Sequence, residues 1–372
     1  MFLDGRRGST ADPDALVTCV DGAVLVKGDL GRSTRWPAMS MSETATSFSS
    51  VQTRLAGRLI EPAGAADERR PLVVMVHGSE QTSAFVNLYA YVLAARNIAV
   101  FVYDKRGVGA SEGYYTQNFE LLAADAAAAL THARAMARGR FGRAGYFGAS
   151  MAGFVAPLAA THSAADFVAI GYGLVVTPIE EDREEMLSEA RTLGLGSDAV
   201  ALINRLSAAT AKLILSGFAE GYAQLAEVRR ELAAKPWAAK LHGEHSGDML
   251  RSSDEELRRF GRVRFDSLEQ IWDYDAAATL RKLNMPLLWV LAGEDREGPI
   301  EGTHKALTQL MKAGKPIDAY VFPNTDHGIL EFVRNADGSR TYTRISEGYL
   351  RLVTDWINGK TVGPYGRAQR ID

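Results

Sequence analysis

Apolar and polar residues follow two different patterns along this chain. Residues 16–30, LVTCVDGAVLVKGDL, place Asp21-Gly22 between two apolar runs, which is typical of a β-hairpin. A polar run, residues 40–50, comes next, and residues 51–62 alternate like a further strand. The pattern predicts antiparallel β-structure at the beginning of the chain.

From Pro71 onward, continuous apolar runs alternate with helical periodicities. Continuous runs are typical of strands that are buried on both faces of a parallel sheet. The predicted strands are residues 71–78, 98–104, 144–150, 166–173, 285–294 and 317–324. The predicted helices are residues 84–97, 118–140, 151–163, 303–315 and 344–359. Strands that alternate with helices predict an α/β fold with a mostly parallel, doubly wound sheet and helices on both faces.

The alternation stops in the middle of the chain, where the sequence is helical and heavily charged and shows no strand pattern. The simplest account is a helical insertion between the strands predicted at residues 166–173 and 285–294 of one sheet domain. We therefore predict an N-terminal extension with a hairpin (residues 1–50), a first part of the core (51–174), a helical cap (175–273) and a second part of the core (274–372).

Composition narrows the possible partners. The chain is 47% hydrophobic and 23% charged, as expected of a globular protein, and its net charge of -3 gives no reason to expect nucleic acid or an anionic membrane as a partner. Cys19 is the only cysteine, so no disulfide can form within the chain. No apolar run resembles a signal peptide or spans a bilayer, so we expect a cytoplasmic protein. Nothing in the sequence indicates an oligomeric state.

Two glycine-rich stretches could each carry a nucleophilic serine. GASEG, residues 109–113, fits the pattern G-x-S-x-G, whereas GASMAG, residues 148–153, has Ala152 where the pattern has glycine. With 35 glycines in 372 residues, a match of letters alone carries little weight. The context of each serine decides instead, because the chemistry needs the serine on a sharp turn between a buried strand and a helix.

Ser150 has this context and Ser111 does not. A predicted strand runs directly into Ser150, and an apolar helix begins immediately after it. Ser111 lies several residues past the end of its strand, and no helix begins at Glu112. Ala152 adds one methyl group to the turn, the smallest departure from glycine. Pro157 lies within the predicted helix, and nothing in the sequence explains a proline at this position.

The partners of such a serine follow it in the order acid, then histidine. His327 lies in a loop just after a strand near the C-terminus, which suits a general base for Ser150. Three carboxylates follow the preceding strand, namely Glu294, Asp295 and Glu297. We predict that Asp295 orients His327, with Glu294 as the alternative. We read Asp326 as a turn residue, because adjacent side chains usually point apart.

Two backbone N–H groups are needed to stabilise an oxyanion. We predict that Met151, which follows the nucleophile, and Ser79, in the loop after the first buried strand, supply them. We read His77, in the same loop, as structural. We also predict a buried ion pair between Asp104 and Arg106. The pair His242 and His245 has the spacing of metal ligands, but its polar surroundings favour an exposed loop, so no metal site is predicted.

These residues together resemble the α/β-hydrolase superfamily. The resemblance rests on HGS, YDKRGVGASEG, GASMAG, Asp295 and NTDHG in this order, and it covers about residues 54–360. The chain looks most like bacterial esterases and serine-aminopeptidase-like hydrolases with a helical cap. The resemblance implies that the segment from Asp104 to Ser111 is structural. It also implies hydrolysis through an acyl-enzyme on Ser150, with no metal or organic cofactor.

Four functions fit these features. We favour a carboxylesterase acting on small-molecule esters. An aminopeptidase or amidase acting on short peptides is the alternative, and its acidic groups for a substrate ammonium could come from residues 180–185. A carbon–carbon bond or lactone hydrolase would use the same triad. A non-catalytic ligand-binding protein of this fold is disfavoured, because all three triad residues are present.

Overall fold

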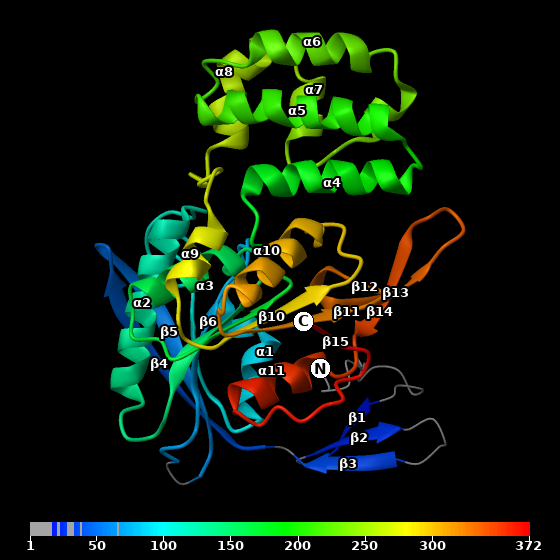
Figure 1. Cartoon of the computed structure of the whole chain (residues 1–372). Coiled ribbons are helices and arrows are strands. Elements are labelled where there is room, and N and C mark those ends of the chain that lie inside the picture. Colours follow the sequence, from blue (N-terminus) through cyan, green and yellow to red (C-terminus); the bar gives the residue numbers. More distant parts are fainter. Residues whose placement is uncertain (1–16, 21–22, 28–32, 38, 65–66) are drawn as a thin grey trace.

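A computed structural model of the chain describes residues 17–20, 23–27, 33–37, 39–64 and 67–372. A nine-stranded sheet forms its centre, with the order β15-β11-β10-β9-β8-β6-β7-β5-β4 (Figure 1). Its strands are β4 (Met41–Ser50), β5 (Thr53–Pro62), β6 (Leu72–Val76), β7 (Ala99–Tyr103), β8 (Ala144–Ala149), β9 (Val168–Gly171), β10 (Leu287–Ala292), β11 (Ile317–Phe322) and β15 (Gln369–Ile371). The strands from β7 to β11 in this order are parallel, and β4, β5 and β15 are antiparallel. The mostly parallel sheet predicted from the apolar runs is confirmed.

Helices cover both faces of the sheet and bury its alternating side chains. One face carries α2 (Phe119–Met136), α3 (Ala152–Thr161), α9 (Ala276–Lys282) and α10 (Glu301–Lys312). The other face carries α1 (Leu88–Ala94) and α11 (Tyr349–Ile357). In β6, Val74 packs into the first core and Val73 into the second, so successive residues serve opposite layers. This double burial explains why the strand reads as one continuous apolar run.

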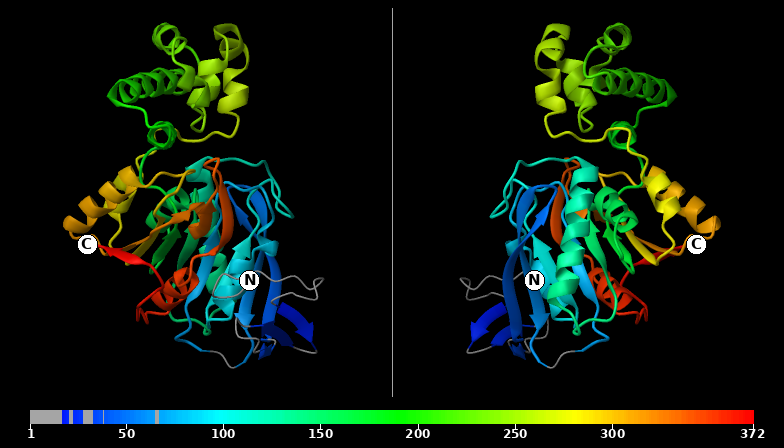
Figure 2. Two further views of the ribbon diagram at one scale, coloured as in Figure 1. Left: turned by 90° about the vertical axis from the view of Figure 1, so that its right-hand side faces the viewer. Right: turned by 90° about the vertical axis from the view of Figure 1, so that its left-hand side faces the viewer.

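A separate layer of helices lies between β9 and β10 in the chain. It consists of α4 (Pro178–Thr192), α5 (Ser197–Leu215), α6 (Tyr222–Leu232), the 3₁₀ helix Pro236–Lys240, α7 (Ser246–Arg251) and α8 (Asp254–Phe265). These helices bury an apolar core of their own. Thr177 and Ser253 each begin a helix with a capping box. Figures 1 and 2 show this layer standing over one edge of the sheet domain. We call residues 175–273 the cap.

The β-structure at the beginning of the chain matches the prediction in part and adds two strands to it. The antiparallel pair β1 (Val17–Val20) and β2 (Ala23–Lys27) matches the predicted hairpin, with the turn at Asp21-Gly22 outside the described residues. Strand β3 (Ser33–Pro37) completes this small sheet. The polar run 40–50, for which no element was predicted, contains strand β4, which pairs with β5 along its whole length.

Strands β12 (Thr325–Asp326), β13 (Leu330–Arg334) and β14 (Arg340–Ile345) form a further sheet that the sequence analysis did not predict. The predicted closing helix begins later than expected, because residues 344–345 belong to β14.

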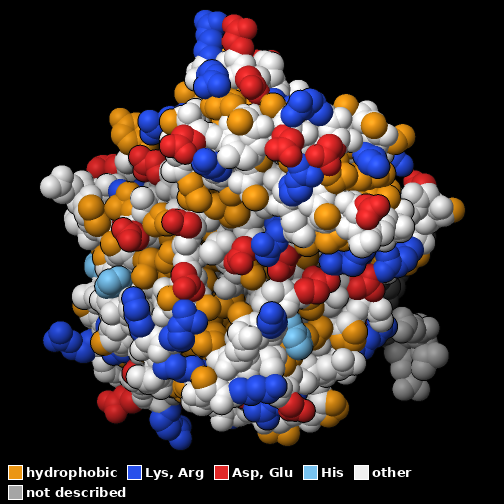
Figure 3. Space-filling model, turned by 45° about the horizontal axis from the view of Figure 1, so that its top comes forward, with side chains coloured by type: hydrophobic (Ala, Val, Ile, Leu, Met, Phe, Trp, Pro, Cys, Tyr) orange, Lys and Arg blue, Asp and Glu red, His pale blue; other side chains and the backbone are white. Residues whose placement is uncertain are grey.

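The face shown in Figure 3 gives no sign of a field of a single charge sign. On the face shown in Figure 3, acidic and basic side chains are interspersed over both the cap and the sheet domain. Among the described residues, no helix combines the length and the apolar character needed to cross a membrane.

Candidate active site

Ser150 lies on a strained turn between β8 and α3. Strand β8 ends at Ala149 and helix α3 begins at Ala152, so only two residues make the connection. Ser150 has a φ of 56°, in the left-handed region that non-glycine residues rarely adopt. Its N–H donates to Gly171 O at 3.0 Å, and its carbonyl accepts from Gly153 N at 2.8 Å. These bonds hold a conformation that costs about 1–3 kcal/mol, a strain that clusters at functional sites.

The methyl group of Ala152 fits this turn because residue 148 is glycine. A Cβ placed on Gly148 would lie 2.5 Å from the Cβ of Ala152, so the methyl group occupies space that another residue at 148 would need. Ala152 itself is fully buried. The next residue, Gly153, packs against Gly173, which a side chain at 153 would approach within 3.1 Å. The small residues of GASMAG therefore serve close packing, and the departure from the G-x-S-x-G letters leaves the turn intact.

His327 connects Ser150 to Asp295. The Ser150 Oγ lies 3.2 Å from His327 Nε2, and His327 Nδ1 lies 2.9 Å from Asp295 Oδ2 and 3.2 Å from Oδ1. The carboxylate fixes the tautomer with the proton on Nδ1, which leaves Nε2 free to accept the serine proton. Asp295 is itself buried and accepts from the backbone N–H groups of Glu297 and Gly298.

The other two candidate carboxylates lie elsewhere. Glu294 points away from the histidine and forms ion pairs with Arg334 and Arg340. Glu297 Oε1 lies 3.6 Å from His327 Nε2, on the side of the ring that faces Ser150. Of the three, only Asp295 contacts Nδ1, so the geometry favours Asp295 as the orienting group.

Electrostatics around His327 favour its protonated form. Burial lowers the pKa of His327, but the hydrogen bond and the negative charge of Asp295 act in the opposite direction, and the pKa lies above the ordinary value. The ring of Tyr172 packs edge-on against the imidazole at a centroid distance of 4.8 Å. Such an arrangement stabilises the imidazolium that a general base becomes when it takes a proton.

Asp326 anchors the loop that carries His327. Its carboxylate accepts from the N–H groups of Arg296 and His327 and from the Tyr342 hydroxyl, and it forms an ion pair with Arg340. Arg340 and Tyr342 both come from β14. The hairpin β13-β14 thus supports the histidine loop, and Asp326 has the turn role that the sequence suggested.

The two predicted oxyanion donors lie beside Ser150. Ser79 lines the same cavities as Ser150, and Met151 lines one of them. Among the described residues, neither the Ser79 N–H nor the Met151 N–H has a protein acceptor. His77 is bonded instead to Tyr103 O at 2.6 Å and Glu80 at 3.3 Å, which agrees with a structural role.

Ser111 lies in a structural turn. Its Oγ donates to Asp104 O at 2.7 Å and accepts from Ala56 N at 2.9 Å. The predicted ion pair between Asp104 and Arg106 is wrong. Arg106 pairs with Asp125 of α2, at 2.6 Å and 2.8 Å, and Asp104 accepts from the loop N–H groups of Ala84 and Ala110. Both side chains are buried and structural, but their partners lie on other segments.

Comparisons with known proteins concern the fold and one part of the sequence. The family model described as "Serine aminopeptidase, S33" matches residues 67–183, which is less than half of the chain. No curated protein matches the chain. Among solved structures, the DcsB protein in complex with its substrate analogue is 14% identical, with 86% of this chain and 100% of that chain covered and a TM-score of 0.51. This chain has the α/β-hydrolase fold.

Two further solved structures are similar to this chain. An esterase of Pyrococcus furiosus is 15% identical, with 77% of this chain and 83% of that chain covered and a TM-score of 0.49. An acylaminoacyl peptidase of Pyrococcus horikoshii is 15% identical, with a TM-score of 0.47. The match covers 82% of this chain and only 42% of the length of that peptidase. At these identities the likeness concerns the fold.

Two cavities of opposite character meet at Ser150. The first, about 310 Å³, is walled largely by apolar side chains of the sheet domain, including Met75, Val102 and Phe147. The second, about 260 Å³, lies toward the cap. Its walls include Glu181, Glu244 and Glu297. Ser150 therefore lies between an apolar pocket and an acidic one.

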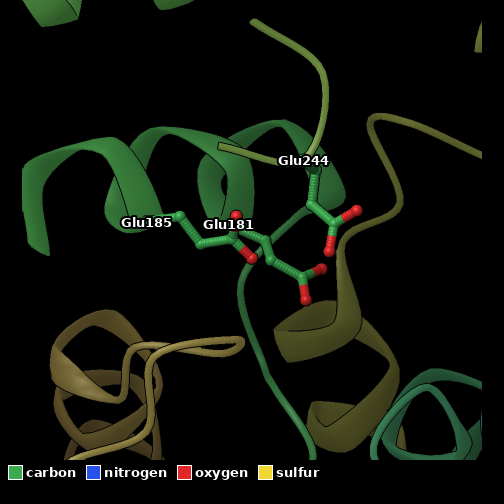
Figure 4. Close-up of side chains that lie close together, drawn as sticks. All are labelled: Glu181, Glu185 and Glu244. Carbon is green, nitrogen blue, oxygen red and sulfur yellow. The ribbon is translucent and has the colours of Figure 1, made fainter. Parts of the chain in front are cut away.

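Two of the three carboxylates in this wall, Glu181 and Glu244, come from the cap, and Glu297 belongs to the sheet domain. Carboxylate oxygens of Glu181, Glu185 and Glu244 lie within 4.8 Å of one another, and Figure 4 shows these side chains converging from α4 and from the loop before α7. Burial and the charges of Glu244 and Glu181 raise the pKa of Glu185 to about 11, and burial also raises the pKa of Glu181 and of Glu244. Among the described residues, this is the one group with the proximity to hold a metal ion.

The histidines of the cap lie in different surroundings. His242 is exposed and faces Glu189 at 3.3 Å. His245 is buried and lines the acidic cavity, and neither ring nitrogen has a hydrogen-bond partner in the described part of the chain. Its Nδ1 approaches Asp182 at 3.5 Å, and its ring packs against Trp272. The two histidines line different cavities.

Sequence reasoning missed several residues of the site. Tyr172 contacts His327 from a segment whose letters carry no motif. Glu297 is one of the three predicted carboxylates, but the sequence did not show that it lies near His327 Nε2. Glu244 joins the acidic wall from a loop that is far from α4 in the sequence. The acidic run 180–185 was noticed, but the periodicity did not show which carboxylates face Ser150.

Proposed function

We propose that this α/β-hydrolase is a serine hydrolase that cleaves acyl compounds through an acyl-enzyme on Ser150. The observation that carries the proposal is the line of contacts from Ser150 through His327 to Asp295, built on a strained turn. A serine hydroxyl needs such a base and an orienting carboxylate to act as a nucleophile at neutral pH.

The proposed reaction has two halves. His327 Nε2 takes the proton as Ser150 Oγ attacks the substrate carbonyl, and the N–H groups of Ser79 and Met151 stabilise the resulting oxyanion. The imidazolium then gives its proton to the leaving group, and the acyl group stays on Ser150. In the second half, His327 activates a water molecule that releases the acid. Asp295 orients the imidazole and stabilises its charge throughout.

Carboxylic esters are the favoured substrates. The apolar pocket beside Ser150 suits the hydrocarbon part of a small or medium ester. Esters are also easier to cleave than amides, because an alcohol is a better leaving group than an amine. We therefore retain carboxylesterase as the first candidate function.

The acidic wall of the second pocket favours a second candidate. Among the described residues, Glu181, Glu185 and Glu244 form no ion pair. Carboxylates that meet without a cation must either be protonated or bind one. A substrate ammonium in this pocket would lie near Ser150, as in an aminopeptidase or an amidase for short peptides.

Labelling with a fluorophosphonate followed by peptide mapping tests the proposed nucleophile. We expect the label on Ser150 in the wild type and in Ser111→Ala, and no label in Ser150→Ala. Label on Ser111, or full esterase activity in Ser150→Ala, would overturn the proposal.

A substrate panel separates the two candidates. Neutral nitrophenyl esters and aminoacyl anilides are assayed in parallel with the wild type. Hydrolysis of the esters supports the first candidate. Hydrolysis of the anilides without the esters supports the second.

A further inference from the structure

A buried cation lies behind the peptide that joins Gly78 to Ser79. Lys105 follows β7 and is 3% exposed. Its Nζ donates to Gly78 O at 2.8 Å. Among the described residues, Lys105 forms no ion pair, so Gly78 O is the one hydrogen-bond acceptor of this ammonium. A buried charge normally requires a carboxylate partner, which makes this contact unusual.

The same peptide carries the expected oxyanion donor. The bond between Gly78 and Ser79 is trans, so the Gly78 carbonyl and the Ser79 N–H point in opposite directions. A cation on the carbonyl side therefore leaves the N–H directed away from Lys105. The Gly78 backbone lies close to the nucleophile, since a Cβ on Gly78 would be 3.5 Å from Ser150 Cβ.

We infer that Lys105 is a positioning residue that holds and polarises the Gly78–Ser79 peptide, which makes the Ser79 N–H a stronger donor to the oxyanion. This inference rests on the proposed function, because it assumes an oxyanion beside Ser150. Lys105 touches neither the substrate nor the reacting atoms, and its effect passes through one peptide group.

The physical basis is cooperative hydrogen bonding. A charged donor on a carbonyl draws electron density through the amide and increases the positive character of the N–H. The effect grows as negative charge develops on the oxyanion, so it stabilises the transition state more than the bound substrate. No proton is transferred and no bond is formed or broken at Lys105.

The surroundings of Lys105 make its charge sensitive to pH. Glu80 attracts the ammonium, the Tyr115 ring lies 5.0 Å from Nζ, and His77 bridges Glu80 to the neighbouring strand. Burial lowers the pKa of Lys105 to about 8, against the attraction of Glu80. Above this pH the amine keeps its hydrogen bond but loses its charge, so we expect the rate to fall on the alkaline side.

Tyr115 provides a matched control. Its hydroxyl donates to Ser79 O at 2.5 Å, so it holds the same loop through the next peptide. Tyr115→Phe removes this anchor and leaves the Gly78–Ser79 peptide polarised. Lys105→Met removes both the anchor and the charge, and Lys105→Gln keeps a neutral donor without the charge.

The experiment compares kcat, KM, the pH profile and the affinity for a trifluoromethyl ketone, which forms an oxyanion on the enzyme. For Lys105→Met we expect kcat to fall about 10- to 100-fold with KM nearly unchanged, and the ketone affinity to fall by a similar factor. The kcat and the ketone affinity of Lys105→Gln should lie between those of Lys105→Met and the wild type. Both Lys105 variants should lose the alkaline limb of the pH profile, which is the fall in rate at high pH. Tyr115→Phe should keep that limb.

Equal losses in Tyr115→Phe and Lys105→Met, with the alkaline limb unchanged in both, would overturn the inference, because loop anchoring alone would explain them. Unchanged ketone affinity in folded Lys105→Met or Lys105→Gln would overturn it as well. Thermal unfolding shows which variants are folded. If Ser150→Ala retains full activity, the proposed function fails instead.

Discussion

Among the described residues, acidic side chains at the carboxyl edge of the sheet are paired with basic ones, whereas the acidic side chains on the cap wall that faces it are not. At the sheet edge, Asp295 is bonded to His327, Asp326 to Arg340, and Arg106 to Asp125. On the cap wall, Glu181, Glu185 and Glu244 converge without a basic partner in the described chain. Paired charges fix geometry, and unpaired ones attract a ligand or a proton. We therefore assign chemistry to the sheet edge and selectivity to the cap.

The largest expected effect concerns the sheet edge. Asp295→Asn should lower kcat by roughly 10⁴-fold, because the amide no longer holds the productive tautomer of His327. The matched control is Glu294→Gln, which changes the adjacent carboxylate, whose ion pairs among the described residues are with Arg334 and Arg340 and not with His327. Steady-state kinetics on one neutral ester check both. Equal losses in the two variants would contradict the assignment of Asp295.

A second effect concerns the turn itself. Gly148→Ala should lower kcat about 10²-fold, because its Cβ would meet the Ala152 methyl at 2.5 Å and displace Ser150. Adding Ala152→Gly to this variant should restore part of the activity. The recovery stays incomplete, since the new Cβ also meets Val76 O at 2.7 Å. A double variant no better than Gly148→Ala would contradict this packing account.

The pH profile tests the charge environment of His327. The base must be neutral, so kcat/KM should fall about tenfold per pH unit below the pKa of His327. Because Asp295 raises that pKa above the ordinary 6.5, the acid limb should begin above 6.5. The limb should move to lower pH in Asp295→Asn. An acid limb that is the same in both proteins would count against the proposed pair.

Neutral substitutions on the cap wall test whether its carboxylates select cationic substrates. Glu181→Gln and Glu244→Gln should each weaken kcat/KM for a cationic ester about tenfold relative to its neutral isostere. The ratio between the two substrates is the measurement, so general damage to the enzyme cancels. A ratio that does not change in either variant would remove the cap wall from substrate selection.

The smallest effect is on stability. The folded-state pKa of Glu185 is raised to about 11, so the folded protein holds a proton that the unfolded chain releases above about pH 4.5. Its contribution is therefore complete at low pH and is lost as pH rises toward 11. Glu185→Gln should stabilise the fold by on the order of 1 kcal/mol at pH 8 and by little at pH 4. Thermal unfolding at both pH values checks the difference.

Much of the sheet domain could be predicted from the sequence. Residues 71–78 and 98–104 became strands because burial on both faces requires apolar side chains at every position. Ser150 was separated from Ser111 by local context alone, since the strand–turn–helix geometry is encoded within a few residues. Strand β4 was missed because it is an edge strand whose exposed positions are polar, with Phe48 among the few apolar residues turned inward.

What could not be predicted depends on contacts between distant segments. Arg106 pairs with Asp125 because α2 passes beside its turn, and no spacing rule shows this. Lys105 reaches Gly78 from the end of the neighbouring strand, and Glu244 joins Glu181 only after the cap has folded. The choice among Glu294, Asp295 and Glu297 likewise depended on where a short turn directs each side chain.

The most direct test of the central claim is to trap the acyl-enzyme itself. The wild type and Ser150→Ala are mixed with a neutral nitrophenyl ester, quenched in acid within the first turnover, and analysed by mass spectrometry of the digested protein. We predict one added acyl group, located on the peptide that contains Ser150, and none in Ser150→Ala. An acyl group on any other residue, or turnover by Ser150→Ala at the wild-type rate, would contradict the account.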